Sequence, residues 1–222
     1  MEAIVFDWDG TLIDSLPGIF EANLQVLAEH GVPFDEERYR AAYVPDWRLM
    51  YQRLGLPDEA LDAAGERWLE LYRQTDDAQL LPRADESLRR LAAAGYVLGL
   101  VTAGHRDVVE DQLQRFGLAG LLPIRVFGND DVASKPHPEP LLRALGQLER
   151  ADRAHAARYV GDVPDDMRMA RAVGALGIGI ESSIGTRAEL LGAGATAVYG
   201  SVGEFVDDLL GTLEVATQRA AS

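Results

Sequence analysis

Hydrophobic and polar positions follow two different periodic patterns along this chain of 222 residues. The apolar run at residues 3–6 is rich in residues that favour strands and predicts a buried first strand. Over residues 16–81 the apolar positions recur at helical spacing, and no strand pattern stands out. Glycine and proline at residues 31–33 and 55–57 interrupt this stretch. The pattern therefore predicts a small helical unit inserted after the first strand.

After Pro82 the pattern changes to helices that alternate with short buried apolar runs. This alternation predicts a parallel sheet with helices on both faces, which is a doubly wound, Rossmann-like α/β fold. The predicted core comprises residues 1–15 and 82–222, and residues 16–81 form a predicted helical cap domain. The predicted core strands after the first are residues 96–102, 124–127, 156–160, 175–180 and 195–199. The predicted core helices are residues 85–94, 107–116, 138–148, 165–173, 186–191 and 202–213. Residues 214–222 are predicted to fray.

Composition restricts the classes of partner. The net charge of -15 argues against nucleic acid or an anionic membrane, because both are bound through basic patches. A small anionic ligand stays open, since a bound cation can invert the local field. The absence of cysteine excludes disulfides and sulfur-ligated metals. Without a signal-like start or an apolar run of membrane-spanning length, we expect a cytoplasmic protein, either monomer or homodimer.

Polar residues gather where the predicted parallel strands end. Asp7 and Asp9 follow the first strand, and Gly10 lets the chain leave it sharply. The carboxyl ends of parallel strands meet at one edge, where open α/β sheets bind their ligands. The residues expected at this edge are Asp7, Asp9, Gly10, Thr102, Ala103, Lys135, Asp162, Asp165 and Asp166.

The carboxylates of this set predict a magnesium site and a covalent mechanism. Asp7, Asp9 and Asp162 are the predicted metal ligands, because Mg²⁺ prefers hard oxygen donors. Asp7 is the predicted nucleophile, which attacks a phosphoryl group and forms an aspartyl phosphate. Asp9 is the predicted acid and base: it protonates the leaving alkoxide and then takes a proton from the hydrolytic water.

The phosphoryl oxygens of such a substrate need hydrogen-bond donors and positive charge. The Thr102 hydroxyl, the backbone amides near Ala103 and the Lys135 ammonium are the predicted donors, and Gly10 belongs to the same substrate-binding group. Lys135 is the single lysine among 21 basic residues, and a guanidinium does not replace its compact charge. Thr102 also suits a hydrogen bond within the turn that follows it, and the sequence leaves that role open.

The order and spacing of these residues resemble the motifs of the haloacid dehalogenase superfamily over nearly the whole chain. The motifs are Asp7-x-Asp9-Gly10-Thr11-Leu12-x-Asp14-Ser15, then Thr102, then Lys135-Pro136-x-Pro138, and finally Gly161-Asp162-x-x-x-Asp166. The chain looks most like the superfamily's phosphatases with a small helical cap, such as phosphoglycolate phosphatase-like proteins. The resemblance implies that Asp9 binds the metal through its carbonyl and that Asp166 orients the site from outside the ligand set. Whether Asp165 or Asp166 lies nearer the metal stays open.

The predicted function is magnesium-dependent hydrolysis of a small phosphorylated, phosphoglycolate-like metabolite. A sugar phosphomutase of the β-phosphoglucomutase type is an alternative, but such mutases look to depend on a lysine in the cap, and residues 16–81 contain none. Phosphonate cleavage fails for the same reason, and Asp9 argues against dehalogenation. A catalytically silent binding module would have an eroded motif, whereas every ionisable motif position is intact here.

Several residues near the motifs have less specific predicted roles. His105 and His137 are predicted to be solvated loop residues, and Trp8 is predicted to pack in the core. Asp14 and Ser15 suit either the connection into the helical unit or contact with substrate, and the sequence does not decide between them.

Overall fold

The computed structural model describes residues 2–75, 77–147 and 156–220. Six strands form one sheet in the order β5-β4-β1-β6-β7-β8, and every neighbouring pair is parallel. The prediction of a doubly wound α/β core is thereby confirmed. The strands are β1 (Ala3–Phe6), β4 (Val97–Val101), β5 (Ile124–Val126), β6 (Ala157–Gly161), β7 (Leu176–Ile180) and β8 (Ala197–Tyr199).

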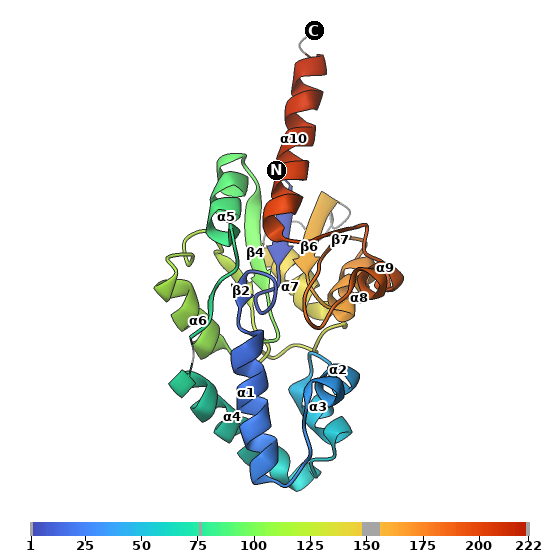
Figure 1. Ribbon diagram of the computed structural model, residues 1–222. Coiled ribbons are helices and arrows are strands. Elements are labelled where there is room, and N and C mark those ends of the chain that lie inside the picture. The colour runs from blue at the N-terminus through green and yellow to red at the C-terminus, as the bar shows by residue number, and fades with distance from the viewer. Residues whose placement is uncertain (1, 76, 148–155, 221–222) are drawn as a thin grey trace.

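Helices cover both faces of this sheet (Figure 1). Successive residues of β1 point to opposite faces. Phe6 therefore packs in one hydrophobic cluster with Leu88 and Leu113, whereas Val5 packs in another with Leu141 and Met169. The core helices are α5 (Ala84–Ala93), α6 (Arg106–Arg115), α7 (Glu139–Gln147), α8 (Pro164–Ala172), α9 (Arg187–Ala193) and α10 (Val202–Ala220).

A separate group of helices lies beyond the carboxyl ends of the strands (Figure 1). It has a second hydrophobic cluster, in which Val26, Leu27, Tyr51 and Leu71 are buried together with Val108 of α6. The helices of this group therefore bury their apolar faces against one another, as the helical periodicity predicts, and contact the core through Val108. Its elements are α1 (Leu16–Glu29), α2 (Glu36–Ala42), α3 (Trp47–Leu54), a short 3₁₀ helix η1 (Asp58–Ala60) and α4 (Leu61–Thr75).

One detail of the sequence prediction is wrong. Strands β2 (Ile13–Asp14) and β3 (Gln79–Leu80) pair antiparallel, although no strand was predicted over residues 16–81. Strands of two residues are too short to produce a recognisable period. Helix α10 extends to Ala220 and so includes most of the segment that was predicted to fray, whereas residues 221–222 lie outside the described ranges. Within the described ranges, no helix combines the length and apolar character needed to cross a membrane.

Candidate active site

Asp7 extends directly from the central strand β1. Its backbone N–H donates to the Val160 carbonyl at 2.8 Å, which continues the pairing of β1 with β6. The Lys135 Nζ lies 2.8 Å from Asp7 Oδ1, and both side chains are buried. Burial raises the pKa of Asp7 from 3.8 to about 7, and the charge of Asp166 adds to this rise while Lys135 opposes it. Asp7 is thus held at the edge of the sheet next to a fixed cation.

Lys135 bridges two carboxylates. Its Nζ is 2.9 Å from Asp166 Oδ1 as well as in contact with Asp7. Burial alone would lower the pKa of Lys135, but the charges of Asp166 and Asp7 raise it above its ordinary value. The ammonium also lies 5.4 Å from the centroid of the Tyr159 ring, whose hydroxyl donates to the Val101 carbonyl at 2.8 Å. Lys135 is therefore charged and fixed from three sides.

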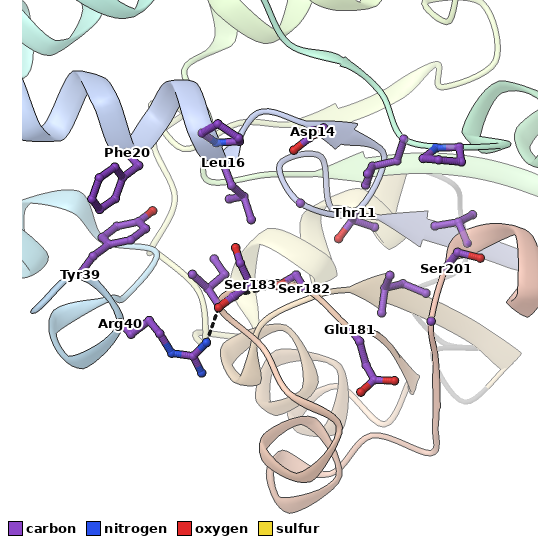
Figure 2. A pocket seen from close by; sticks show the side chains of 18 of the residues that line it. Thr11, Asp14, Leu16, Phe20, Tyr39, Arg40, Glu181, Ser182, Ser183 and Ser201 are labelled. Atoms are coloured by element: carbon purple, nitrogen blue, oxygen red, sulfur yellow. Dashed lines mark hydrogen bonds between the residues drawn. The ribbon is translucent and has the colours of Figure 1, made fainter. Parts of the chain in front are cut away.

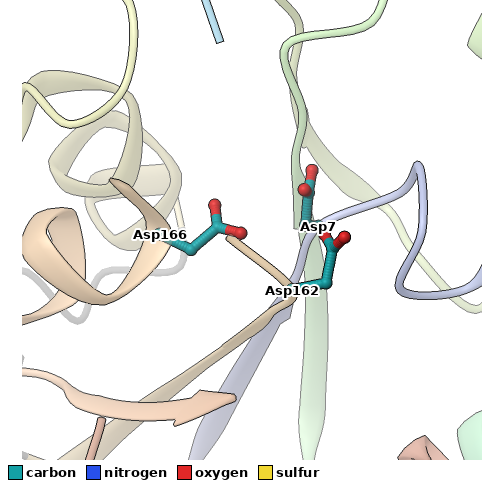
Figure 3. A group of neighbouring side chains, drawn as sticks. All are labelled: Asp7, Asp162 and Asp166. Carbon is teal, nitrogen blue, oxygen red and sulfur yellow. The ribbon is translucent and has the colours of Figure 1, made fainter. Parts of the chain in front are cut away.

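Three buried carboxylates, those of Asp7, Asp162 and Asp166, lie close together at this edge of the sheet (Figure 3). One oxygen each from Asp7, Asp162 and Asp166 lie within 4.8 Å of one another. The Thr11 hydroxyl donates to Asp162 Oδ1 at 3.2 Å, but Asp162 Oδ2 is buried without a hydrogen-bond partner among the described residues. Burial and the charges of Asp7 and Asp166 raise the pKa of Asp162 well above its usual range. A divalent cation bound by these hard oxygens would satisfy that orphaned atom.

Gly10 shapes the turn that leaves β1. Its φ of 72° lies in the left-handed region, and a Cβ at this position would stand 2.4 Å from Asp162 Oδ2. Only glycine therefore allows the turn to pass so close to the carboxylate. Asp9 lies in the same turn, and its Oδ1 accepts a hydrogen bond from the Ser15 hydroxyl at 2.6 Å. Ser15 thus orients the Asp9 carboxylate and makes no side-chain cap on α1.

Thr102 follows β4, the strand that neighbours β1. Its Oγ1 accepts from the Gly104 N–H at 2.9 Å, so the threonine does hold the turn after it. A Cβ on Gly104 would lie 3.2 Å from both Thr102 Oγ1 and Asp9 Oδ2, which shows that this turn reaches the Asp9 carboxylate. Ala103 is exposed in the same turn, and its carbonyl packs closely against Gly128.

The structure distinguishes the two neighbouring aspartates that the sequence left undecided. Asp166 is fully buried, contacts Lys135 and accepts from the Val163 N–H at 3.2 Å, which anchors the start of α8. Asp165 lies outside the carboxylate group and pairs with Arg168 one turn along the helix. Asp166 alone of the two is placed to act on the site.

Helix α2 contributes residues that the sequence analysis did not single out. The pKa of Tyr39 is raised by burial and then by the charges of Asp9 and Asp162. The pKa of Tyr43, which follows α2, is raised by burial and by Tyr39 and Asp162. Both phenol groups therefore lie within electrostatic range of the carboxylates. No spacing in the sequence marks these tyrosines, because they reach the site only through the packing of the helical unit.

A cleft of about 730 Å³ separates α1 and α2 from the loops that follow β7 and β8 (Figure 2). Thr11 and Ser182 line it from the core side, and Tyr39 and Arg40 line it from the helical unit. The Arg40 guanidinium donates to the Ser183 carbonyl, so a direct contact joins the two sides.

The two loop histidines lie at the margin of this arrangement. His105 is half-buried, and its Nε2 lies 3.2 Å from Asn129 Nδ2. Its predicted solvation is therefore only partial. His137 is exposed and accepts from the Glu139 N–H at 3.2 Å.

Comparison with known proteins gives consistent matches. A family model for haloacid dehalogenase-like hydrolases matches residues 1–174. A phosphoglycolate phosphatase of Yersinia pseudotuberculosis is 32% identical over 194 residues, covering 81% of each chain. A phosphoglycolate phosphatase of Rhodospirillum rubrum is 34% identical over 212 residues, covering 89% of this chain and 86% of that protein. The crystal structure of a hydrolase from Pseudomonas syringae superimposes with a TM-score of 0.85 at 26% identity, covering 94% of this chain and 98% of that one.

Proposed function

The chain belongs to the haloacid dehalogenase-like hydrolase family, and from this premise we propose that it is a magnesium-dependent phosphatase of small phosphomonoesters. The family match establishes a hydrolase. The observation that carries the finer proposal is the buried arrangement of Asp7, Lys135 and Asp162, in which a nucleophile lies beside a fixed cation and an unsatisfied carboxylate oxygen.

The proposed metal is Mg²⁺, held by Asp7 and Asp162 together with oxygens of the Asp9 segment. The fit rests on the donor set, which consists of hard oxygens, and on the orphaned Asp162 Oδ2. When bound, the cation would supply positive charge opposite the phosphoryl oxygens. Asp166 is bound to Lys135 and to the start of α8, and we assign it an orienting role.

The first chemical step is proposed as attack by a carboxylate oxygen of Asp7 on phosphorus. The bond from phosphorus to the ester oxygen breaks, and Asp9 gives its proton to the departing alkoxide. Lys135 offsets the repulsion between the Asp7 carboxylate and the phosphate dianion. Thr102 and the amides after it face the same edge and are proposed to hold the phosphoryl oxygens.

The second step is proposed as hydrolysis of the aspartyl phosphate at phosphorus. Asp9, now ionised, takes a proton from water, and the hydroxide that results displaces the Asp7 carboxylate. Inorganic phosphate leaves, and Asp9 regains the proton it lost in the first step. The Ser15 hydroxyl holds the Asp9 carboxylate in place for both transfers.

We propose that residues 16–81 act as a cap that closes over this edge of the sheet. Tyr39 lines the cleft from the side of residues 16–81, and the Arg40 guanidinium connects these residues to the core. Relatives named phosphoglycolate phosphatase make phosphoglycolate the first substrate to test. The absence of any lysine from residues 16–81 disfavours the mutase alternative.

The test is phosphate release from a panel containing phosphoglycolate, sugar phosphates and p-nitrophenyl phosphate, with Mg²⁺ or with EDTA. We expect Mg²⁺-dependent release that Asp7→Asn abolishes. Asp165→Asn is the matched control, because Asp165 is not part of the carboxylate group and pairs with Arg168, and it should retain activity. Isomerisation of a sugar phosphate without net phosphate release would identify a mutase. Inactivity in both assays would favour a binding module.

A further inference from the structure

Trp8 lies between the two motif aspartates and points into the core. It is fully buried, and its indole N–H donates to Gln112 Oε1 at 2.7 Å. The Trp8 carbonyl also accepts the backbone N–H of Leu12 at 2.9 Å and that of Ile13 at 3.2 Å. Trp8 therefore anchors the turn that holds Asp9 through its backbone as well as its side chain.

Gln112 extends this contact to the helical unit. It lies on α6 with only 1% of its surface exposed, and its Nε2 donates to the Tyr72 hydroxyl at 3.3 Å. Tyr72 lies on α4 and is itself buried. A buried amide is costly unless it is hydrogen-bonded, so contacts to two separate elements give Gln112 a defined orientation. The hydrogen bonds thus connect the catalytic turn, the core and the helical unit in one buried series.

We propose that Gln112 is a positioning residue, which fixes the turn of Asp7 and Asp9 through the Trp8 indole and aligns the helical unit through Tyr72. The proposal rests on the proposed phosphatase function for its kinetic consequence only. An apolar side chain would fill the same space between α4, α6 and the turn after β1, but it would remove the acceptor of the Trp8 indole N–H and the hydrogen bond from Gln112 to the Tyr72 hydroxyl. Small displacements of reacting groups lower turnover steeply, so loss of the anchor acts on kcat.

The direct test replaces Gln112 by leucine, which has a similar size and no polar atoms. We expect Gln112→Leu to lower kcat about tenfold while KM changes less than about twofold. Asn23→Leu is the matched control, because Asn23 is equally buried and accepts from the Tyr51 hydroxyl at 2.8 Å wholly within the helical unit. That control should lose comparable stability and keep the native kcat.

A double substitution separates the hydrogen bond from packing. Gln112→Leu leaves the Trp8 indole N–H without its acceptor, and Trp8→Phe removes that N–H. The kcat of the double variant should therefore be no lower than that of the slower single variant. Mg²⁺ affinity measured by titration calorimetry gives a readout that needs no turnover. We expect about tenfold weaker Mg²⁺ binding in Gln112→Leu and native affinity in Asn23→Leu.

These measurements distinguish failure of the inference from failure of the proposed function. Absence of turnover in the native protein would refute the function, and Mg²⁺ affinity would then decide the role of Gln112. Native kcat and native Mg²⁺ affinity in Gln112→Leu, with reduced stability as in the control, would overturn the inference and leave Gln112 a structural residue.

Discussion

Removing the charge of Asp7 should make the metal-free protein more stable at alkaline pH. Burial is the main cause that raises the pKa of this carboxyl from 3.8 to about 7. Because the pKa of Asp7 is higher in the folded than in the unfolded protein, the neutral carboxyl of Asp7 contributes to stability fully below pH 4. This contribution is lost as pH rises through 7. A rise of about three pH units corresponds to about 4 kcal/mol at about 1.4 kcal/mol per unit. Asp7→Asn avoids this cost and keeps an oxygen that can accept from Lys135.

The assay is thermal unfolding in EDTA at pH 5 and at pH 8.5, for native protein, Asp7→Asn and the control Asp165→Asn. One kcal/mol moves the Tm of a chain of this length by about 2–4 °C, so Asp7→Asn should melt several degrees higher at pH 8.5. The difference in Tm between Asp7→Asn and the native protein should be smaller at pH 5. Mg²⁺ should raise the Tm of the native protein more than that of the variant, because binding stabilises the folded state. A variant less stable than native at pH 8.5, or a gap independent of pH, would refute the reasoning.

Three further substitutions test other parts of the site. Ser15→Ala removes the hydrogen bond from the Ser15 hydroxyl to Asp9 Oδ1 and should lower kcat about tenfold on alkyl phosphates. The loss should be smaller on p-nitrophenyl phosphate, whose leaving group needs no proton, and equal losses on both substrates would contradict the role of Ser15. Tyr159→Phe removes the hydrogen bond from the Tyr159 hydroxyl to the Val101 carbonyl and should lower the free energy of unfolding in urea by about 1–3 kcal/mol. An unchanged urea midpoint would contradict a stabilising role for this hydrogen bond. Arg40→Ala removes a partly exposed contact between the helical unit and the core, and KM should rise a few-fold. An unchanged KM would show that this contact does not contribute to substrate binding.

The parallel core could be predicted because the hydrophobic pattern that specifies each strand and helix lies within a short stretch of sequence. Each strand after Pro82 is a short apolar run followed by a helical pattern, and this order leaves little choice of fold. The strand ends then bring Asp7 and Asp162 together, and the loop between β5 and α7 brings Lys135 to them. The hydrolase family inferred from these residues is confirmed by the family match.

Features that depend on packing between distant elements could not be predicted. Asp165 and Asp166 are about 100° apart around a helix, so only one faces the site, and the choice depends on where α8 begins. The charges of the carboxylates act on Tyr39 and Tyr43 because of the fold of the helical unit, which no motif describes. The burial of Trp8 could be predicted, but its hydrogen-bond partner lies more than a hundred residues away.

In the proposed mechanism, Asp7 carries the phosphoryl group during turnover. The most direct measurement uses Asp9→Asn with p-nitrophenyl phosphate and Mg²⁺, because this ester needs no acid in the first step whereas the second step still needs the base. Rapid quenching followed by borohydride reduction and peptide mass spectrometry should show a burst of nitrophenolate equal to the enzyme concentration, with homoserine in place of Asp7. The mechanism would be contradicted if the native protein turns over the substrate but the variant shows neither a burst nor a modified Asp7.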